Sequence, residues 1–175
     1  MSSLLQPVVA HVKSKEVDWG VVRAYPHDNG HTYKVPVYDM EVSGLGPSAT
    51  AKTTVFKVIR FGVKQSSASD TPTVVGLKDK QVHILSRVDY MEGSWQLYGN
   101  FLIHDGANNP QKSAWGQIGC IEVVGMMGGK DAWKVFEALV LSLSGAKTAA
   151  KLGKSGKFSI KIDAVATRPP LVEHS

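Results

Sequence analysis

The chain has 175 residues, of which 43% are hydrophobic and 20% charged, so we expect residues 1–175 to form a single globular domain. The single cysteine, Cys120, excludes an intramolecular disulfide and a metal site built only from cysteines. No apolar run reaches the roughly 18 residues of a membrane-spanning helix, so membrane insertion is not expected. The net charge of +5 favours anionic partners.

Runs of β-branched and aromatic residues, separated by turn clusters, predict strands along most of the chain. Asn29-Gly30 is a strong hairpin signal and separates the first two runs. Polar and glycine-containing segments between the later runs predict loops at 65–73 and 105–116. The strands are expected at 17–25, 32–42, 53–63, one or two within 74–88, and at 95–104, 119–124 and 158–164.

One helix is predicted at 131–144, because apolar residues recur there at helical spacing. Asp131 is expected to cap its N-terminus and Gly145 to close its C-terminus. The predicted fold class is therefore mainly β, a sandwich or barrel with this helix packed on it.

Four lysines follow the predicted helix, at positions 147, 151, 154 and 157. The pattern is typical of a solvated basic loop, although such a surface also suits an anionic polymer. No aromatic residues are interleaved with these lysines, so a stacking platform for nucleic acid is not expected.

The most informative segment surrounds His104 and Cys120. An apolar strand ends at His104, a polar loop follows, and the chain re-enters a strand through Gly119-Cys120. A thiol becomes a good nucleophile when a nearby imidazole removes its proton, so the two residues form a candidate catalytic pair. The alternative is a packing role, with Cys120 buried and inert.

Gly119 has no Cβ and would let backbone N–H groups of Gly119 and Cys120 point at a developing oxyanion. Asp105 is a weak candidate for orienting His104, because adjacent side chains on an extended chain diverge. A backbone carbonyl serves at least as well. Ser113 and Trp115 lie in the loop and are candidates for contacting substrate, with loop packing as the alternative.

The segment resembles the L,D-transpeptidase (YkuD-type) catalytic domain. His104-Asp105-Gly106 matches the first motif of that family, Gly119-Cys120-Ile121 matches the second, and Thr71-Pro72-Thr73 is similar to its Thr-Pro-Thr-Gly stretch. The match covers about 50 residues. The chain departs from the family pattern at four positions, Val74, Gln117, Ile118 and Glu122.

The resemblance implies a YkuD-like fold and a cysteine-dependent enzyme that acts on peptidoglycan stem peptides without a cofactor or a metal. The reaction would be L,D-transpeptidation, L,D-carboxypeptidation or D-amino acid exchange, with Cys120 as nucleophile and His104 as base. Gly106, Ser113 and Trp115 would contact substrate. A cysteine peptidase of different specificity shares the same pair, and a non-catalytic β-sandwich module that binds an anionic polymer is the alternative.

The N-terminal sequence lacks a basic region followed by a continuous apolar run, so no signal peptide is expected. The implied substrate lies in the periplasm, and the chain is similar to a distant branch of peptidoglycan-directed toxin effectors. We therefore expect delivery by a secretion system to a target cell, with an immunity protein as a further partner. A cytoplasmic role is the other expectation.

Overall fold

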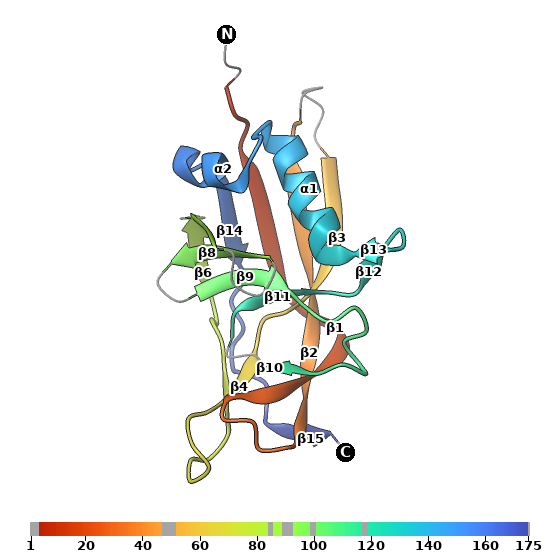
Figure 1. Ribbon diagram of the computed structural model, residues 1–175, viewed down its shortest axis with the longest axis vertical. Helices are drawn as coiled ribbons and strands as arrows, with labels where there is room; N and C mark the ends of the chain where they lie inside the picture. The colour runs from red at the N-terminus through yellow and green to blue at the C-terminus, as the bar shows by residue number, and fades with distance from the viewer. Residues whose placement is uncertain are drawn as a thin grey trace.

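Strands form most of the chain (Figure 1). This computed structural model describes residues 4–46, 52–83, 86–88, 93–98, 101–116 and 119–174. The described strands are β1 (Val8–Pro26), β2 (Thr32–Gly44), β3 (Lys52–Ile59), β4 (Gly62–Gln65), β5 (Thr73–Val75), β6 (Lys80–His83), β7 (Ser86–Val88), β8 (Ser94–Tyr98), β9 (Phe101–Asp105), β10 (Trp115–Gly116), β11 (Ile121–Val124), β12 (Met126–Met127), β13 (Lys130–Asp131), β14 (Phe158–Ile162) and β15 (Val172–His174). The described helices are α1 (Ala132–Ser144) and α2 (Ala149–Ser155). The mainly β class is confirmed.

Thirteen strands of the described chain belong to one mixed sheet, whose central path runs β5-β4-β1-β2-β3-β11-β9-β8-β7. The long strand β1 connects different parts of this sheet, because it pairs with β2 along most of its length, with β14 near its start, and with β10 and β4 near its end. Register shifts between Val12 and Asp18 bend β1, so that its two halves serve different parts of the sheet. β12 and β13 form a separate two-stranded sheet.

The predicted hairpin at Asn29-Gly30 is confirmed, since β1 and β2 pair in antiparallel fashion on either side of it. Two predicted single strands are divided. The run at 95–104 forms the antiparallel strands β8 and β9, and the run at 53–63 forms β3 and β4. This second break falls at Arg60, whose buried guanidinium donates hydrogen bonds to backbone carbonyls of other segments. The run at 74–88 contributes three strands, β5, β6 and β7.

Helix α1 is confirmed, and Gly145 closes it in the left-handed conformation with its N–H bonded to the Leu141 carbonyl. The predicted capping role of Asp131 is wrong, because its side chain makes no capping hydrogen bond. The expectation of a single helix is also wrong. Thr148 caps α2 by accepting a hydrogen bond from the Lys151 N–H, and the buried Leu152 anchors this short helix to the core. The lysine-rich segment is therefore helical in part.

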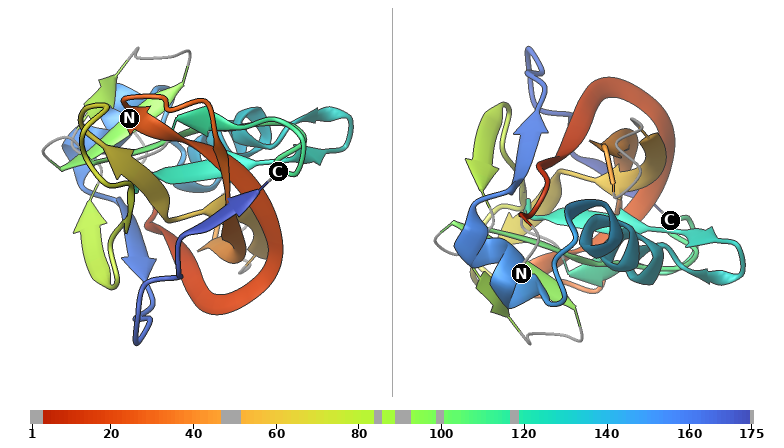
Figure 2. Two further views of the ribbon diagram at one scale, coloured as in Figure 1. Left: turned by 90° about the horizontal axis from the view of Figure 1, so that it is seen from below. Right: turned by 90° about the horizontal axis from the view of Figure 1, so that it is seen from above.

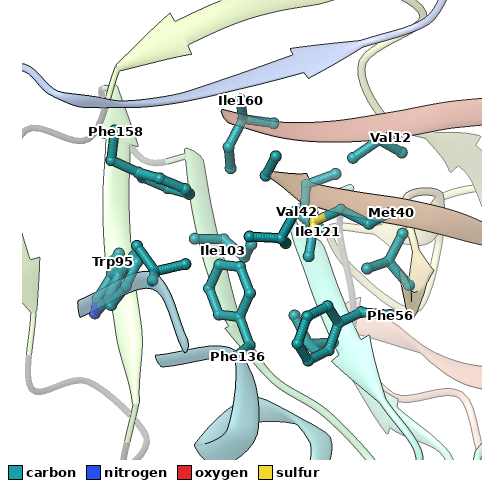
Figure 3. Close-up of a cluster of buried hydrophobic side chains, with 14 of the residues drawn as sticks. Val12, Met40, Val42, Phe56, Trp95, Ile103, Ile121, Phe136, Phe158 and Ile160 are labelled. Atoms are coloured by element: carbon teal, nitrogen blue, oxygen red, sulfur yellow. The ribbon is translucent and has the colours of Figure 1, made fainter. Parts of the chain in front are cut away.

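The main core lies between α1 and the sheet, where aromatic side chains pack edge to face (Figure 3). The Phe136 ring of α1 lies 5.3 Å from the Trp95 ring and 6.1 Å from the Phe158 ring, measured between centroids. Both helices lie near the start of β1, and β15 lies at the opposite end of the molecule (Figures 1 and 2). A second, smaller cluster lies under the far half of β1 and β2 and includes Ile59 and Val124.

Candidate functional site

Cys120 and His104 lie on neighbouring chain segments in the middle of the sheet. β11 pairs with β9 in parallel, with Ile121 opposite Ile103 and Glu122 opposite His104. Side chains alternate between the two faces of a strand, and Ile103 and Ile121 belong to the main core. Glu122 and His104 are therefore opposite each other on the other face. Cys120 directly precedes β11, and its thiol forms a hydrogen bond with the backbone of Leu102, two residues before His104.

The imidazole of His104 is held by a short hydrogen bond, 2.6 Å from its Nδ1 to the backbone carbonyl oxygen of Asp105. A carbonyl oxygen only accepts, so Nδ1 carries the hydrogen and Nε2 is the basic nitrogen of the neutral ring. Burial lowers the pKa of His104, although the bond to Asp105 acts in the opposite direction. The backbone of Asp105, rather than a triad-like carboxylate, thus fixes the tautomer that a general base requires.

The thiol of Cys120 is half-buried. Burial raises the pKa of Cys120, a hydrogen bond with the Leu102 backbone lowers it, and the nearby Glu122 carboxyl raises it again. The resting site therefore holds a protonated thiol beside a neutral imidazole. A base has to take the thiol proton as the sulfur attacks, because a preformed thiolate is disfavoured.

Gly119 lies in close contact with the segment that follows Thr71-Pro72-Thr73. A Cβ added at Gly119 would lie 2.6 Å from the Cα of Gly76 and 3.1 Å from the carbonyl oxygen of Val75, and its φ is +96°. Both the space and the backbone conformation thus require glycine at this position. Sequence reasoning missed the contact with Gly76, for which the only signal is a glycine two positions beyond Val74.

Glu122 is the second residue of this site that sequence reasoning missed. Its side chain is 1% exposed, and one oxygen accepts a hydrogen bond from the Ala107 backbone. The other oxygen, Oε2, has no hydrogen-bond partner in the described chain. Burial raises the pKa of Glu122 to about 8, the Ala107 bond lowers it and the charge of Asp105 raises it. The one indication of Glu122 in the sequence was that it departs from the family pattern at this position.

Gly106 lies directly against Glu122. A Cβ at this position would come within 2.3 Å of the Glu122 Cγ and 2.7 Å of its Oε1. The structure therefore gives Gly106 a packing role, making room for the buried carboxyl. The predicted contact of Gly106 with substrate stays a prediction.

The loop after His104 is anchored on both sides. The Ala107 carbonyl accepts a hydrogen bond from the Gly125 N–H at 2.9 Å, and the Pro110 carbonyl accepts one from the Val21 N–H at 2.8 Å. Ser113 is exposed and Trp115 begins β10, which pairs with β1. Their contacts with substrate stay predictions, and Gln117 and Ile118 lie outside the described residues.

Two further features bear on the kind of site. In the described part of the chain, no three His, Cys, Asp or Glu side chains are grouped so that they could hold a metal ion. His11 and His31 instead bond to carboxylates, at 2.6 Å to Asp163 and 2.7 Å to Glu173. Among the same residues, no helix has the length and apolarity needed to cross a membrane.

Comparisons with family models, curated proteins and solved structures find no match to this chain. The similarity to L,D-transpeptidases therefore rests on three short motifs of the sequence. The chemistry of the site has to be argued from His104, Cys120 and the groups that surround them.

Proposed function

We propose that this protein is a cysteine-dependent acyltransferase that acts on the peptide stems of peptidoglycan. Its reaction would be L,D-transpeptidation, L,D-carboxypeptidation or D-amino acid exchange on a YkuD-like fold. The observation that carries the proposal is that His104 lies on β9, which pairs in parallel with the strand β11 that begins directly after Cys120, and that Nε2 of His104 is the basic nitrogen. The family resemblance supplies the substrate class.

The reaction follows from this pair. Nε2 of His104 accepts the thiol proton while Sγ of Cys120 bonds to the carbonyl carbon that follows the diamino acid of the stem. Backbone amides of Gly119 and Cys120 stabilise the oxyanion. The intermediate collapses to a thioester as the C–N bond breaks, and the imidazolium gives its proton to the departing D-amino acid.

The second half of the reaction restores the enzyme. An amine or a water molecule gives a proton to Nε2 of His104 and attacks the thioester carbon. The C–S bond then breaks, and the sulfur recovers its proton from the imidazolium. An amine acceptor gives transpeptidation or exchange, and water gives a tripeptide stem. The neutral resting pair suits this route, because each step needs His104 first as a base and then as an acid.

Delivery and partners belong to the same proposal. A peptidoglycan-directed effector would be carried by a secretion system into the periplasm of a target cell, and the producer would hold a cognate immunity protein. The positive charge of the chain suits the free carboxylates of peptide stems.

Purified muropeptides test the proposal directly. The protein is incubated with tetrapeptide stems, with and without a free D-amino acid, and the products are identified by mass spectrometry. We expect tripeptide stems, or tetrapeptide stems whose terminal residue has been exchanged, and no product with Cys120→Ala. Cleavage of glycan strands with intact stems would contradict the reaction class.

A non-catalytic binding module remains the alternative, and the exposed lysines 147, 151, 154 and 157 on and around α2 favour it. In that case muropeptides stay unchanged and Cys120 resists iodoacetamide at every pH at which the protein is folded. Binding of an anionic polymer would then be weakened by charge reversal at Lys151 and Lys154.

A further inference from the structure

Glu122 is a buried acid in direct register with the proposed base. It lies opposite His104 in the parallel pair of β11 and β9, and two residues after Cys120 in the sequence. Few carboxyl groups are buried to 1% exposure without a charged partner, because removing a carboxylate from water is costly. Such a group points to a role other than packing.

The position of this carboxyl is fixed from several sides. The absent Cβ of Gly106 makes room for its Cγ and Oε1, and the Ala107 backbone donates a hydrogen bond to it. Oε2 has no hydrogen-bond partner in the described chain. The loop that supplies Gly106 and Ala107 is itself tied to the sheet through the Ala107 carbonyl and the Gly125 N–H. The carboxyl is thus held in place beside the pair.

The charge of Glu122 acts on the thiol. Glu122 and Cys120 are two residues apart in the sequence, and a negative carboxylate at Glu122 raises the pKa of Cys120. In its acid form the same group exerts no such effect. The site therefore has two electrostatic states, one that permits loss of the thiol proton and one that opposes it.

We propose that Glu122 is a positioning residue of the Cys120–His104 pair, and that its protonation decides how readily the Cys120 thiol gives up its proton. The proposal deepens the proposed function and rests on it. With Glu122 neutral at physiological pH, the Cys120 thiol can lose its proton and attack. Ionisation of Glu122 at higher pH opposes this loss and lowers the activity on the alkaline side of the pH profile. This third residue is a carboxyl that works uncharged, unlike the carboxylate of a catalytic triad.

Few other titratable groups of the described chain lie near Glu122. β9 contributes His104, directly opposite, and Asp105, the next residue along that strand, while Cys120 precedes β11. On β3 the residue opposite Glu122 is the apolar Ile59, and the nearest charged side chain along that face, Lys57, pairs with Asp39 of β2. The charge of Asp105 acts in the same direction as burial and keeps Glu122 protonated.

The rate of Cys120 alkylation by iodoacetamide, measured between about pH 6 and 10 on the whole folded protein, tests this proposal. Glu122→Gln keeps the shape of the side chain and an acceptor for the Ala107 N–H, but it cannot ionise. We expect equal rates for wild type and variant at neutral pH. As the pH rises past about 8, the midpoint for the variant should lie about one pH unit below that of wild type. The control Glu41→Gln removes a half-exposed carboxylate of β2 and should change nothing.

Two outcomes would overturn the proposal. The profiles of wild type and Glu122→Gln could coincide at every pH, or they could differ by the same factor at every pH, as a structural effect would produce. If Glu122→Gln fails to fold, the wild-type profile alone decides, because ionisation of Glu122 must appear in it as a second inflection. Alkylation needs no substrate, so muropeptides left unchanged would contradict the proposed function without affecting this result.

Discussion

The two faces of the β9–β11 pair carry opposite chemistry. On one face Ile103, Ile121 and Val123 join the main core beneath α1. On the other face lie the half-buried His104 and the buried Glu122, and Cys120 directly precedes β11. Burial shifts the pKa of each of these three groups toward its uncharged form. Burial of the apolar face stabilises the folded protein, whereas burial of titratable groups on the polar face costs free energy. Titratable groups with shifted pKa values are concentrated at the functional sites of proteins, so this face is the candidate functional site.

The largest expected effect is on the polar face, where His104→Ala removes the base. Turnover of muropeptides should fall by at least about 10³-fold, because the thiol is protonated at rest and the proposed base that takes its proton is gone. The pH needed for Cys120 alkylation should also rise. Cys120→Ala serves as the control, with equal loss of turnover and a nearly unchanged thermal midpoint. An unchanged alkylation profile in His104→Ala would mean that the two residues are not coupled.

A second effect concerns the pH dependence of stability. The pKa of Glu122 is raised from 4.5 to about 8, so between these values the folded protein holds a proton that the unfolded chain releases. The contribution of Glu122 to the free energy of unfolding is therefore largest below pH 4.5 and decreases as the pH rises to about 8. At about 1.4 kcal/mol per pKa unit, the total decrease is about 5 kcal/mol.

Urea unfolding of wild type and Glu122→Gln at pH 5 and pH 9 measures this loss. The variant should gain on wild type as the pH rises, because glutamine has no proton to lose. His104 acts in the opposite direction at acid pH, since its pKa is lowered and stability falls as the pH drops through it, but it does so equally in both proteins. Parallel pH profiles of the unfolding free energy for the two proteins would show that folding does not shift the pKa of Glu122.

The smallest expected effect on the site comes from the apolar face. Phe136→Ala removes the ring of α1 that contacts Trp95 and Phe158, and should destabilise the protein by about 3 to 5 kcal/mol. The alkylation rate of Cys120 should stay the same under conditions where the variant is folded. Chemical unfolding and alkylation on one sample measure both. A changed alkylation rate in the folded variant would mean that the two faces are not independent.

Sequence patterns predicted those features of the fold that local spacing encodes. Asn29-Gly30 marked the first hairpin, and the helical spacing that ends at Gly145 marked α1. Helix α2 was missed because seven residues give little periodicity and its lysines suggested a solvated loop. The division of 95–104 was missed because its apolar run outweighed Gly99-Asn100, a turn signal that lies outside the described residues.

The candidate site shows the same limit. His104 and Cys120 could be picked out because each ends or begins an apolar strand beside a loop. Glu122 could not, since its burial depends on strand register and on the space left by Gly106 in the loop after β9. Gly76 likewise meets Gly119 only through the tertiary fold. Contacts between segments distant in sequence are not written in any local pattern.

The pairing of β1 with β14 has a consequence for how the chain folds. Val8 pairs with Phe158 and Val12 with Ile162, so β1 has one of its partners at a large distance in the sequence. Loops of this length close slowly, and sheets dominated by distant pairings fold in milliseconds to seconds. During synthesis β1 leaves the ribosome long before β14 exists. The edge of β1 that pairs with β14 therefore stays unpaired until then, and the sheet is completed only after β14 and β15 have been made.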